Sequence, residues 1–158
     1  MVGFIGDPLP EGLALHAGLD EWPPRTRNII RYVFTHPAAR SVLGDWERSA
    51  ATCVANLRHL IGIDPGAPDL HGIHEELAAA SADFRRLWNG HDVHPRRTGR
   101  KTFHHPQVGD IVLTHQTWHQ HDSATRLSLY QPEPAHTDQV TLLAHTLQPS
   151  GRPDRTFS

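Results

Sequence analysis

The sequence contains one cysteine, no long apolar run and no excess of charge of either sign, and each absence excludes a class of protein. Cys53 has no second cysteine with which to form an internal disulfide, so a disulfide-stabilised secreted scaffold is excluded. No apolar stretch approaches the roughly 20 residues that cross a bilayer. The first residues, MVGFIGDPLPEG, lack the basic start and apolar core of a signal peptide. These absences predict a cytoplasmic protein with no membrane partner.

The balance of charge also argues against nucleic acid as a direct partner. The chain has 15 Lys and Arg residues against 17 Asp and Glu residues, so it has no basic field to attract a phosphate backbone. Its 158 residues are enough for one domain with a buried core, and too few for separate DNA-binding and effector-binding modules of ordinary size. We therefore expect one domain that does not bind DNA by itself.

Hydrophobic periodicity separates a lead-in from a helical part. Residues 1–24 are rich in Gly and Pro and have weak periodicity, which predicts an extended or loosely turned lead-in. Apolar residues at steps of three and four then predict a helix over residues 25–36 and one long helix between Pro37 and Gly62. Shorter helices are expected over residues 70–77 and from an N-cap at Ser81 to residue 90.

After residue 99 the pattern changes to short apolar runs separated by polar and Pro-containing turns. The runs Ile111–Leu113 and Leu127–Tyr130 predict antiparallel strands, and Val140, Leu143 and Leu147 predict a last helix. Helices followed by strands indicate an α+β fold, with several N-terminal helices packed on a small antiparallel sheet and one C-terminal helix.

Five blocks of sequence together resemble one known family. They are NIIRYVFTHPAAR at Asn28–Arg40, DWERSAATCVANLR at Asp45–Arg58, FRRLWNGHDV at Phe84–Val93, GRKTFHHPQVGDIVL at Gly99–Leu113 and RLSLYQPEP at Arg126–Pro134. These blocks resemble the ligand-binding domain of MmyB-like actinobacterial transcription regulators of the XRE helix-turn-helix type. The resemblance places that domain at residues 25–148, between the lead-in and a tail at residues 149–158.

The resemblance implies a PAS-like fold, in which helices cover one face of an antiparallel sheet and enclose an apolar cavity for a fatty-acid-like ligand. The family's N-terminal helix-turn-helix domain has no counterpart in this sequence, and its first PAS strands are not recognisable in residues 3–20. Without those strands one edge of the sheet would be open, to be covered by residues 1–20 or by a second copy of the chain. We therefore expect a homodimer.

The candidate ligand cavity is mostly apolar, as pockets for small organic molecules usually are. Its expected lining residues are Trp46, Cys53, Val54, Leu57, Phe84, Leu87, Trp88, Trp118 and Tyr130. Ordinary core packing is the competing interpretation for each of them. Cys53 has the character of a small buried hydrophobe rather than of a nucleophile.

Two neighbouring arginines and one aspartate are the polar candidates at this cavity. The guanidinium of either Arg85 or Arg86 could hold the carboxylate or enolate of an acidic ligand at the cavity mouth. Arg85 is the candidate ligand-binding residue of the two. A salt bridge to Glu47 or Asp92 is the alternative. Asp92 is itself a candidate ligand-binding residue, because it lies in the loop that follows the helix stop at Gly90.

Histidine suggests two further kinds of site. His91, His105 and His115 are candidate acid–base catalysts, because His transfers protons near neutral pH, although structural hydrogen bonding is the alternative. His115, His119 and His121 are spaced by two residues, as metal ligands on a strand can be. The sequence offers them no second cysteine and no flanking carboxylate at the usual spacing, so we expect no metal site and no cofactor.

Three functions remain open. The first is a stand-alone PAS-like small-molecule-binding domain, which binds a hydrophobic, acidic metabolite of the fatty-acid or polyketide type and is linked to antibiotic or other secondary metabolism. The second is a cofactor-free biosynthetic enzyme, a cyclase or isomerase, which reuses the same pocket for His acid–base catalysis. The third is an interaction module that pairs with a full-length regulator through an exposed sheet edge.

Overall fold

A computed structural model describes residues 10–90, 98–119 and 126–146, without the side chains of residues 10, 11, 117–119 and 126–128. Its α-helices are α1 (Pro10–Leu15), α2 (Ile29–Thr35), α3 (Ala39–Val42), α4 (Trp46–Ile63), α5 (Pro68–Ala80), α6 (Ala82–Asn89) and α7 (Thr137–Thr146). Its 3₁₀ helices are η1 (Leu19–Glu21), η2 (Pro24–Thr26) and η3 (Pro134–His136). Its strands are β1 (Thr98–His105), β2 (Gly109–His119) and β3 (Arg126–Pro132).

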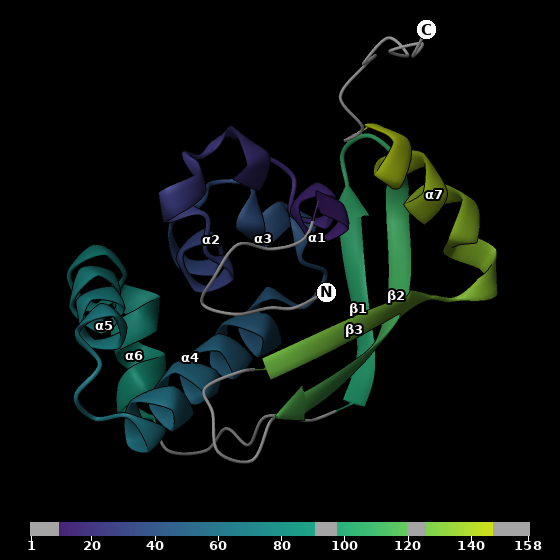
Figure 1. Cartoon of the computed structure of the whole chain (residues 1–158). Coiled ribbons are helices and arrows are strands. Elements are labelled where there is room, and N and C mark those ends of the chain that lie inside the picture. Colours follow the sequence, from purple (N-terminus) through teal and green to yellow (C-terminus); the bar gives the residue numbers. More distant parts are fainter. Residues whose placement is uncertain (1–9, 91–97, 120–125, 147–158) are drawn as a thin grey trace, which may run out of the picture.

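The strands form one antiparallel sheet in the order β1-β2-β3. In Figure 1, α1 and α7 lie beside this sheet, whereas α5 and α6 lie at the far, C-terminal end of α4. The N-terminal end of α4 points toward the sheet. The predicted α+β fold is confirmed, and its arrangement is consistent with a helix-rich PAS-like ligand-binding domain.

The prediction of an extended lead-in is wrong for residues 10–24, and residues 1–9 lie outside the described part of the chain. α1 and η1 form here, and Leu15 and Leu19 are buried in the core. Gly18 has a φ of 87°, in the left-handed region that favours glycine. The glycines and prolines therefore mark turns between buried leucines. Each apolar run is too short to show helical periodicity, and this is why the sequence predicted extended chain.

The single long helix predicted between residues 37 and 62 is two helices, α3 and α4. The chain leaves helical geometry at Leu43, which forms an isolated bridge with Phe103, and the Gly44 amide donates to the Thr102 carbonyl oxygen at 2.9 Å. A Cβ on Gly44 would lie 2.9 Å from the Thr102 Cβ, so only glycine fits this approach to β1. Asp45 then caps α4. The apolar steps of three and four continue across the break and conceal it.

The predicted start and end of α6 are confirmed. The Ser81 hydroxyl accepts a hydrogen bond from the Phe84 amide at 3.1 Å, and Gly90 is the C-cap. The turn before α5 also forms as expected, because the Asp64 carboxylate accepts from the Gly66 amide at 3.2 Å. Local polar side chains therefore set these boundaries.

Both predicted strands form, and the structure adds β1, whose polar sequence TGRKTFHH has few apolar residues. Phe103 on β1 pairs with Ile111 on β2, and both are buried on the face of the sheet that α1 and α7 cover. The predicted last helix forms as α7, with Leu143 buried and residue 147 outside the described part.

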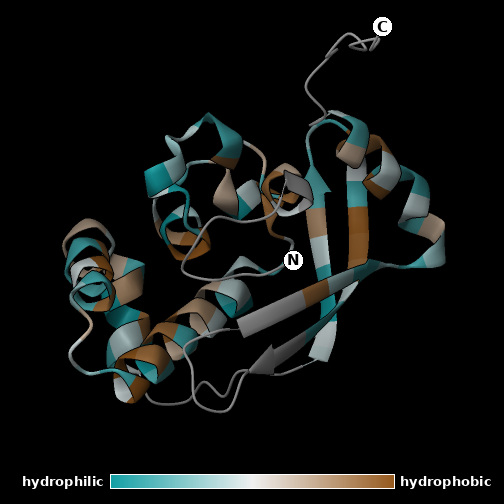
Figure 2. Ribbon diagram, viewed as in Figure 1, coloured by the Kyte–Doolittle hydropathy of each residue, from teal (hydrophilic) through white to brown (hydrophobic). Residues whose placement is uncertain are grey.

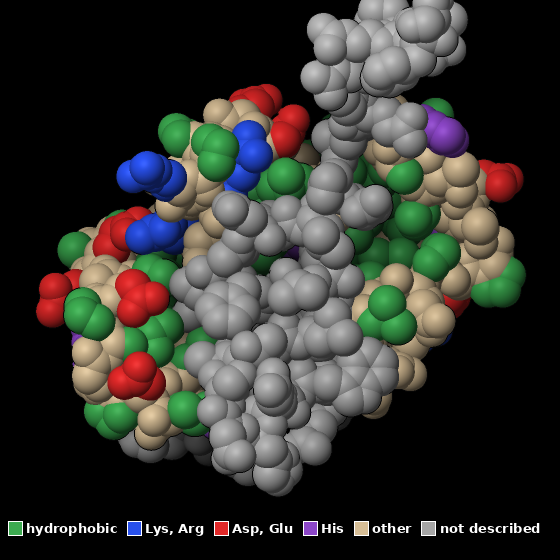
Figure 3. All heavy atoms as spheres, in the orientation of Figure 1, with side chains coloured by type: hydrophobic (Ala, Val, Ile, Leu, Met, Phe, Trp, Pro, Cys, Tyr) green, Lys and Arg blue, Asp and Glu red, His purple; other side chains and the backbone are tan. Residues whose placement is uncertain are grey.

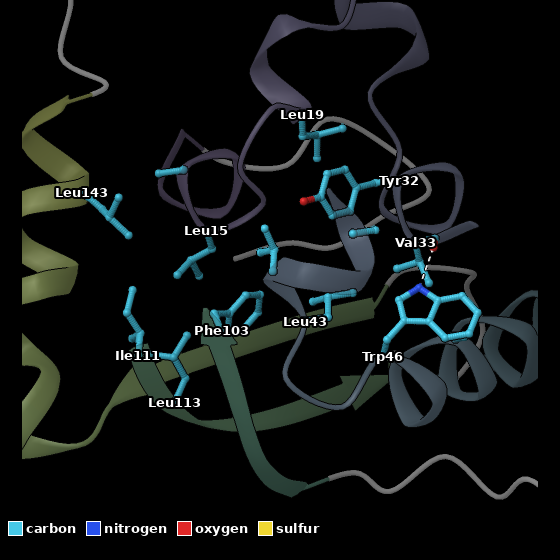
Figure 4. Close-up of a cluster of buried hydrophobic side chains, with 14 residues drawn as sticks. Leu15, Leu19, Tyr32, Val33, Leu43, Trp46, Phe103, Ile111, Leu113 and Leu143 are labelled. Atoms are coloured by element: carbon cyan, nitrogen blue, oxygen red, sulfur yellow. Dashed lines mark hydrogen bonds between the residues drawn. The ribbon is translucent and has the colours of Figure 1, made fainter. Parts of the chain in front are cut away.

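The buried side chains form two clusters. The sheet core contains Ala14, Leu15, Leu19, Tyr32, Val33, Ala39, Val42, Leu43, Trp46, Ala50, Phe103, Ile111, Leu113 and Leu143 (Figure 4). The helix core contains Ile30, Val54, Leu57, Leu70, Ile73, Leu77 and Phe84. Figure 2 shows the corresponding hydrophobic segments in the middle of β1 and β2 and on the helices.

Charged side chains of both signs are interspersed over the helical part of the face seen in Figure 3. Some form pairs between helices, such as Arg31 of α2 with Glu76 of α5 at 2.8 Å. Exposed pairs of this kind contribute about 0–1 kcal/mol each. They help to orient the helices, whereas the two cores supply most of the stabilisation.

Candidate functional site

A cleft of about 660 Å³ lies between the N-terminal half of α4 and β1. Its described lining residues come from the connection before α4, from α4 itself, from β1 and at one position from β2. They are Leu43, Gly44, Asp45, Arg48, Ser49, Ala51, Thr52, Thr98, Gly99, Arg100, Lys101, Thr102, His104 and His115. The volume falls in the range of roughly 300–1,000 Å³ that is usual for small-molecule sites.

The local fold explains why this space stays open. The chain contacts the edge of β1 at Gly44 and then turns away into α4. Asp45, Arg48, Ser49 and Thr52 recur at steps of three and four, so they lie on one face of the helix, and all four line the cleft. The cleft is thus walled by one helix face and one strand edge.

The lining carries more positive than negative charge. Three permanent cations, Arg48, Arg100 and Lys101, face a single carboxylate, Asp45. The Arg48 Nε lies 3.1 Å from an Asp45 oxygen, and the Arg100 Nε lies 2.6 Å from a Glu133 oxygen. Lys101 forms no salt bridge with any residue that the structure describes. Lys101 is therefore the cation best placed to bind an anion.

Lys101 contacts the ring of Tyr130 on β3, and Tyr130 in turn contacts His115 on β2. Its Nζ lies 3.4 Å from the Tyr130 hydroxyl and 5.6 Å from the centre of that ring. The His115 ring stacks on Tyr130 with centroids 6.1 Å apart, and its Nδ1 donates to the Gly99 carbonyl oxygen at 2.9 Å. Tyr130 therefore connects Lys101 with His115, and both of these residues line the cleft.

The predicted apolar ligand residues lie in the cores rather than on this cleft. Trp46 is buried in the sheet core, and Tyr130 packs against it. Six of the predicted residues are buried in the helix core or packed against it: Cys53, Val54, Leu57, Phe84, Leu87 and Trp88. Of these, Cys53 and Leu87 also contact the sheet core. The Trp118 side chain and Asp92 lie outside the described part. None of the described members of the set lines the cleft.

The two candidate arginines of α6 both bind protein groups. Arg85 is exposed and donates from Nη1 to the Ala78 carbonyl oxygen at 2.5 Å. Arg86 pairs with Glu47 at 2.7 Å and with Asp83 at 3.2 Å. For Arg86 the structure shows the salt-bridge alternative, and neither guanidinium lines the cleft.

The three candidate catalytic histidines have different surroundings. His115 lines the cleft, and His91 lies outside the described part. His105 is buried, donates from Nε2 to the Ala14 carbonyl oxygen at 2.9 Å and accepts from the Gln107 amide at Nδ1. Burial lowers the pKa of His105. Both of its ring nitrogens hold backbone groups, and the ring joins β1 to the end of α1.

The possible metal ligands are only partly within the described chain. Of His115, His119 and His121, only the side chain of His115 is described. Among described side chains, no group of three or more His, Cys, Asp or Glu residues is arranged to hold a metal ion.

Sequence reasoning missed almost all of the cleft. His115 is the one predicted site residue among its described lining. The segment GRKTF at Gly99–Phe103 had carried the family resemblance without a functional role. A usable signal was present in it, because two adjacent cations between threonines are unusual in a strand that must bury one face.

The fold and the cleft together define a class: an α+β domain with a small-molecule-sized site between a helix and the edge of an antiparallel sheet. The chain matches the family model of the MmyB-like transcription regulator ligand binding domain over residues 10–145, and it belongs to that family. It is therefore a ligand-binding domain of the regulator type. Comparisons with curated proteins and with solved structures give no match. No helix in the described ranges is long and apolar enough to span a membrane.

Proposed function

We propose that this domain binds a small acidic organic molecule in the cleft between α4 and β1. The observation that carries the proposal is the cleft itself, with Arg48, Arg100 and Lys101 against the single carboxylate of Asp45 on its lining. Carboxylates accept charge-assisted hydrogen bonds from Arg and Lys, so this excess of cations favours an anionic ligand. Lys101 is the main anchor in this proposal.

The proposed ligand is a hydrophobic acid of the fatty-acid or polyketide type, connected with antibiotic or other secondary metabolism. Leu43 and Ala51 are buried and line the cleft, where they can contact an apolar chain. Membership of a family of regulator ligand-binding domains supports a sensing role. The proposal further places the domain in the cytoplasm, where a DNA-binding partner would transmit the signal.

A homodimer is a further part of the proposal. Within the described ranges β3 pairs only with β2, so a second copy of the chain could cover its outer edge. Light scattering at high protein concentration is expected to give twice the monomer mass. A monomer mass under those conditions would rule out the dimer without affecting the cleft.

Calorimetric titration with dodecanoate tests the binding site. Lys101→Gln and Arg48→Gln each remove one cation from the lining, whereas Arg25→Gln removes an exposed cation of η2 outside the cleft. We expect each cleft variant to bind about tenfold more weakly, because a charged hydrogen bond contributes roughly 1.5–3 kcal/mol. The Arg25 variant is expected to bind as the unaltered protein does. Equal affinity in all four proteins would refute the location of the site.

The alternative function, a cofactor-free cyclase or isomerase, is favoured by one observation. His115 stacks on Tyr130 and lines the cleft as Lys101 does, so a proton-transfer group adjoins the proposed ligand. Native mass spectrometry followed by extraction and reincubation of any co-purified molecule distinguishes the two functions. Recovery of that molecule unchanged supports sensing, whereas conversion to an isomer that is lost in His115→Gln supports an enzyme.

A further inference from the structure

The outer edge of β1 is paired at a single point within the described chain. The Gly44 amide donates to the Thr102 carbonyl oxygen at 2.9 Å, and Leu43 forms an isolated bridge with Phe103. The chain then leaves the edge at Asp45, where α4 is capped. The connection is therefore the beginning of an added strand that stops after one residue pair.

The rest of this edge presents backbone groups to the cleft. In an antiparallel ladder, the N–H and C=O groups of alternate residues point to the same side of a strand. Because the Thr102 carbonyl points away from β2, the N–H and C=O groups of Arg100 and Thr98 do so as well. No backbone hydrogen bond from a described residue reaches Arg100 or Thr98 on this side, and both residues line the cleft.

We infer that this cleft also binds a second class of ligand, a short, extended, acidic peptide segment that pairs with β1 at Thr98 and Arg100. This inference goes beyond the proposed function and uses the same cation-lined cleft. The peptide backbone would continue the pairing that Gly44 begins, and its carboxylates would meet Arg48 and Lys101. About four residues at roughly 3.3 Å each would cover the unpaired part of the edge.

The composition of the lining also suits a peptide. Apolar side chains are few among the described lining residues, whereas hydroxyl groups, glycines and cations dominate. Any ligand that covers the Arg100 and Thr98 backbone groups must replace the hydrogen bonds that they make with water. Peptide amides would satisfy those groups.

Calorimetry with synthetic peptides tests the inference. The probes are acetyl-Val-Glu-Val-Glu-amide, two forms N-methylated at one or the other set of alternate amides, the peptide with Lys in place of Glu, and dodecanoate. We expect the Glu peptide to bind, one N-methylated form to bind about tenfold more weakly, and the Lys peptide to bind more weakly still. N-methylation of the other set, which faces away from β1, should have little effect.

A matched pair of protein variants tests the same contact from the other side. Arg100→Ala removes the guanidinium, and Arg100→Pro also removes the backbone N–H that faces the cleft, a change that edge strands accommodate. We expect the Pro variant to bind the Glu peptide about tenfold more weakly than the Ala variant. If the Pro variant does not fold, as judged by circular dichroism, the N-methylated peptides still decide the question.

The outcomes separate this inference from the proposed function. Equal affinity of all N-methylated and unmethylated Glu peptides would show that charge alone binds them and would overturn the strand pairing. Binding of dodecanoate but of no peptide would also overturn it, while leaving an acid-binding cleft intact. If no probe binds in a manner sensitive to Lys101→Gln, both the inference and the proposed function fall.

Discussion

Acidification should destabilise this protein through His16, a histidine buried in the sheet core. Its ring makes edge contacts with Tyr32 and Phe103, each with ring centroids 5.4 Å apart, and its Nδ1 donates to the Gly12 carbonyl oxygen at 2.8 Å. Burial lowers the pKa of His16 from 6.5 to about 4; the Gly12 hydrogen bond opposes this shift, and the charge of Lys101 adds to it. The native protein therefore keeps this ring neutral where the unfolded chain protonates it.

The sign and size of the effect follow from proton linkage. Above pH 6.5 the ring is neutral in both states, and the free energy of unfolding does not depend on it. As the pH falls from 6.5 to about 4, the unfolded state binds a proton that the native state does not, so stability is lost. At about 1.36 kcal/mol for each pKa unit, the full loss is about 3 kcal/mol, of which about 2 kcal/mol is lost by pH 5.

The substitution His16→Asn tests this value, because the Asn amide can replace the Nδ1 donor but does not titrate. Urea unfolding followed by tryptophan fluorescence at pH 7, 6 and 5 would give the free energy of unfolding of both proteins. We expect the variant to lose about 2 kcal/mol less than the unaltered protein between pH 7 and 5. His145→Asn, at an exposed position on α7, is the matched control and should retain the original pH dependence.

Only the difference between pH values matters, since the loss of the ring contacts lowers the stability of the His16 variant at every pH. Parallel stability curves for the unaltered protein and His16→Asn would refute the reasoning. A direct check is the pH titration of the His16 ring by NMR, with a midpoint expected near pH 4. A midpoint near 6.5 would show that the ring is not buried as described.

Two further substitutions test the packing. Ser81→Ala removes the hydroxyl that accepts from the Phe84 amide, and urea unfolding should show a loss of about 1 kcal/mol; an unchanged midpoint would mean that water caps α6 equally well. Trp46→Phe leaves the Val33 carbonyl oxygen without the indole N–H that donates to it at 2.8 Å (Figure 4), which should cost about 1–3 kcal/mol in thermal or urea unfolding. A loss below about 0.5 kcal/mol would show that this carbonyl finds another donor.

Much of the helical part could be predicted because its signals are local. Pro37 ends the possibility of one continuous helix, Ser81 caps α6, and the apolar steps of α5 identify its buried face. The break at Leu43–Asp45 was missed for the opposite reason. It depends on β1, whose pairing residues lie about sixty positions further along the chain, and no local pattern reports such a contact.

The candidate site shows the same limit. The large apolar residues chosen from the sequence are buried, as their chemistry requires, but buried residues of this kind fill cores as readily as they line cavities. Arg48 and Lys101 lie more than fifty positions apart, and neither belongs to a motif that names a ligand. Their position on one cleft follows from the direction in which α4 leaves the edge of β1.

The sequence by itself determined the family, the α+β class and the start and end of α6, because sequence blocks, periodicity and capping residues are encoded within short stretches. The tertiary structure alone decided that α1 packs on the sheet, that Gly44 meets β1, and that cations from α4 and β1 share one cleft. These are contacts between residues distant in sequence. These contacts depend on the packing of the whole chain, because an apolar surface or an unpaired strand edge is covered by an element that can be distant in sequence.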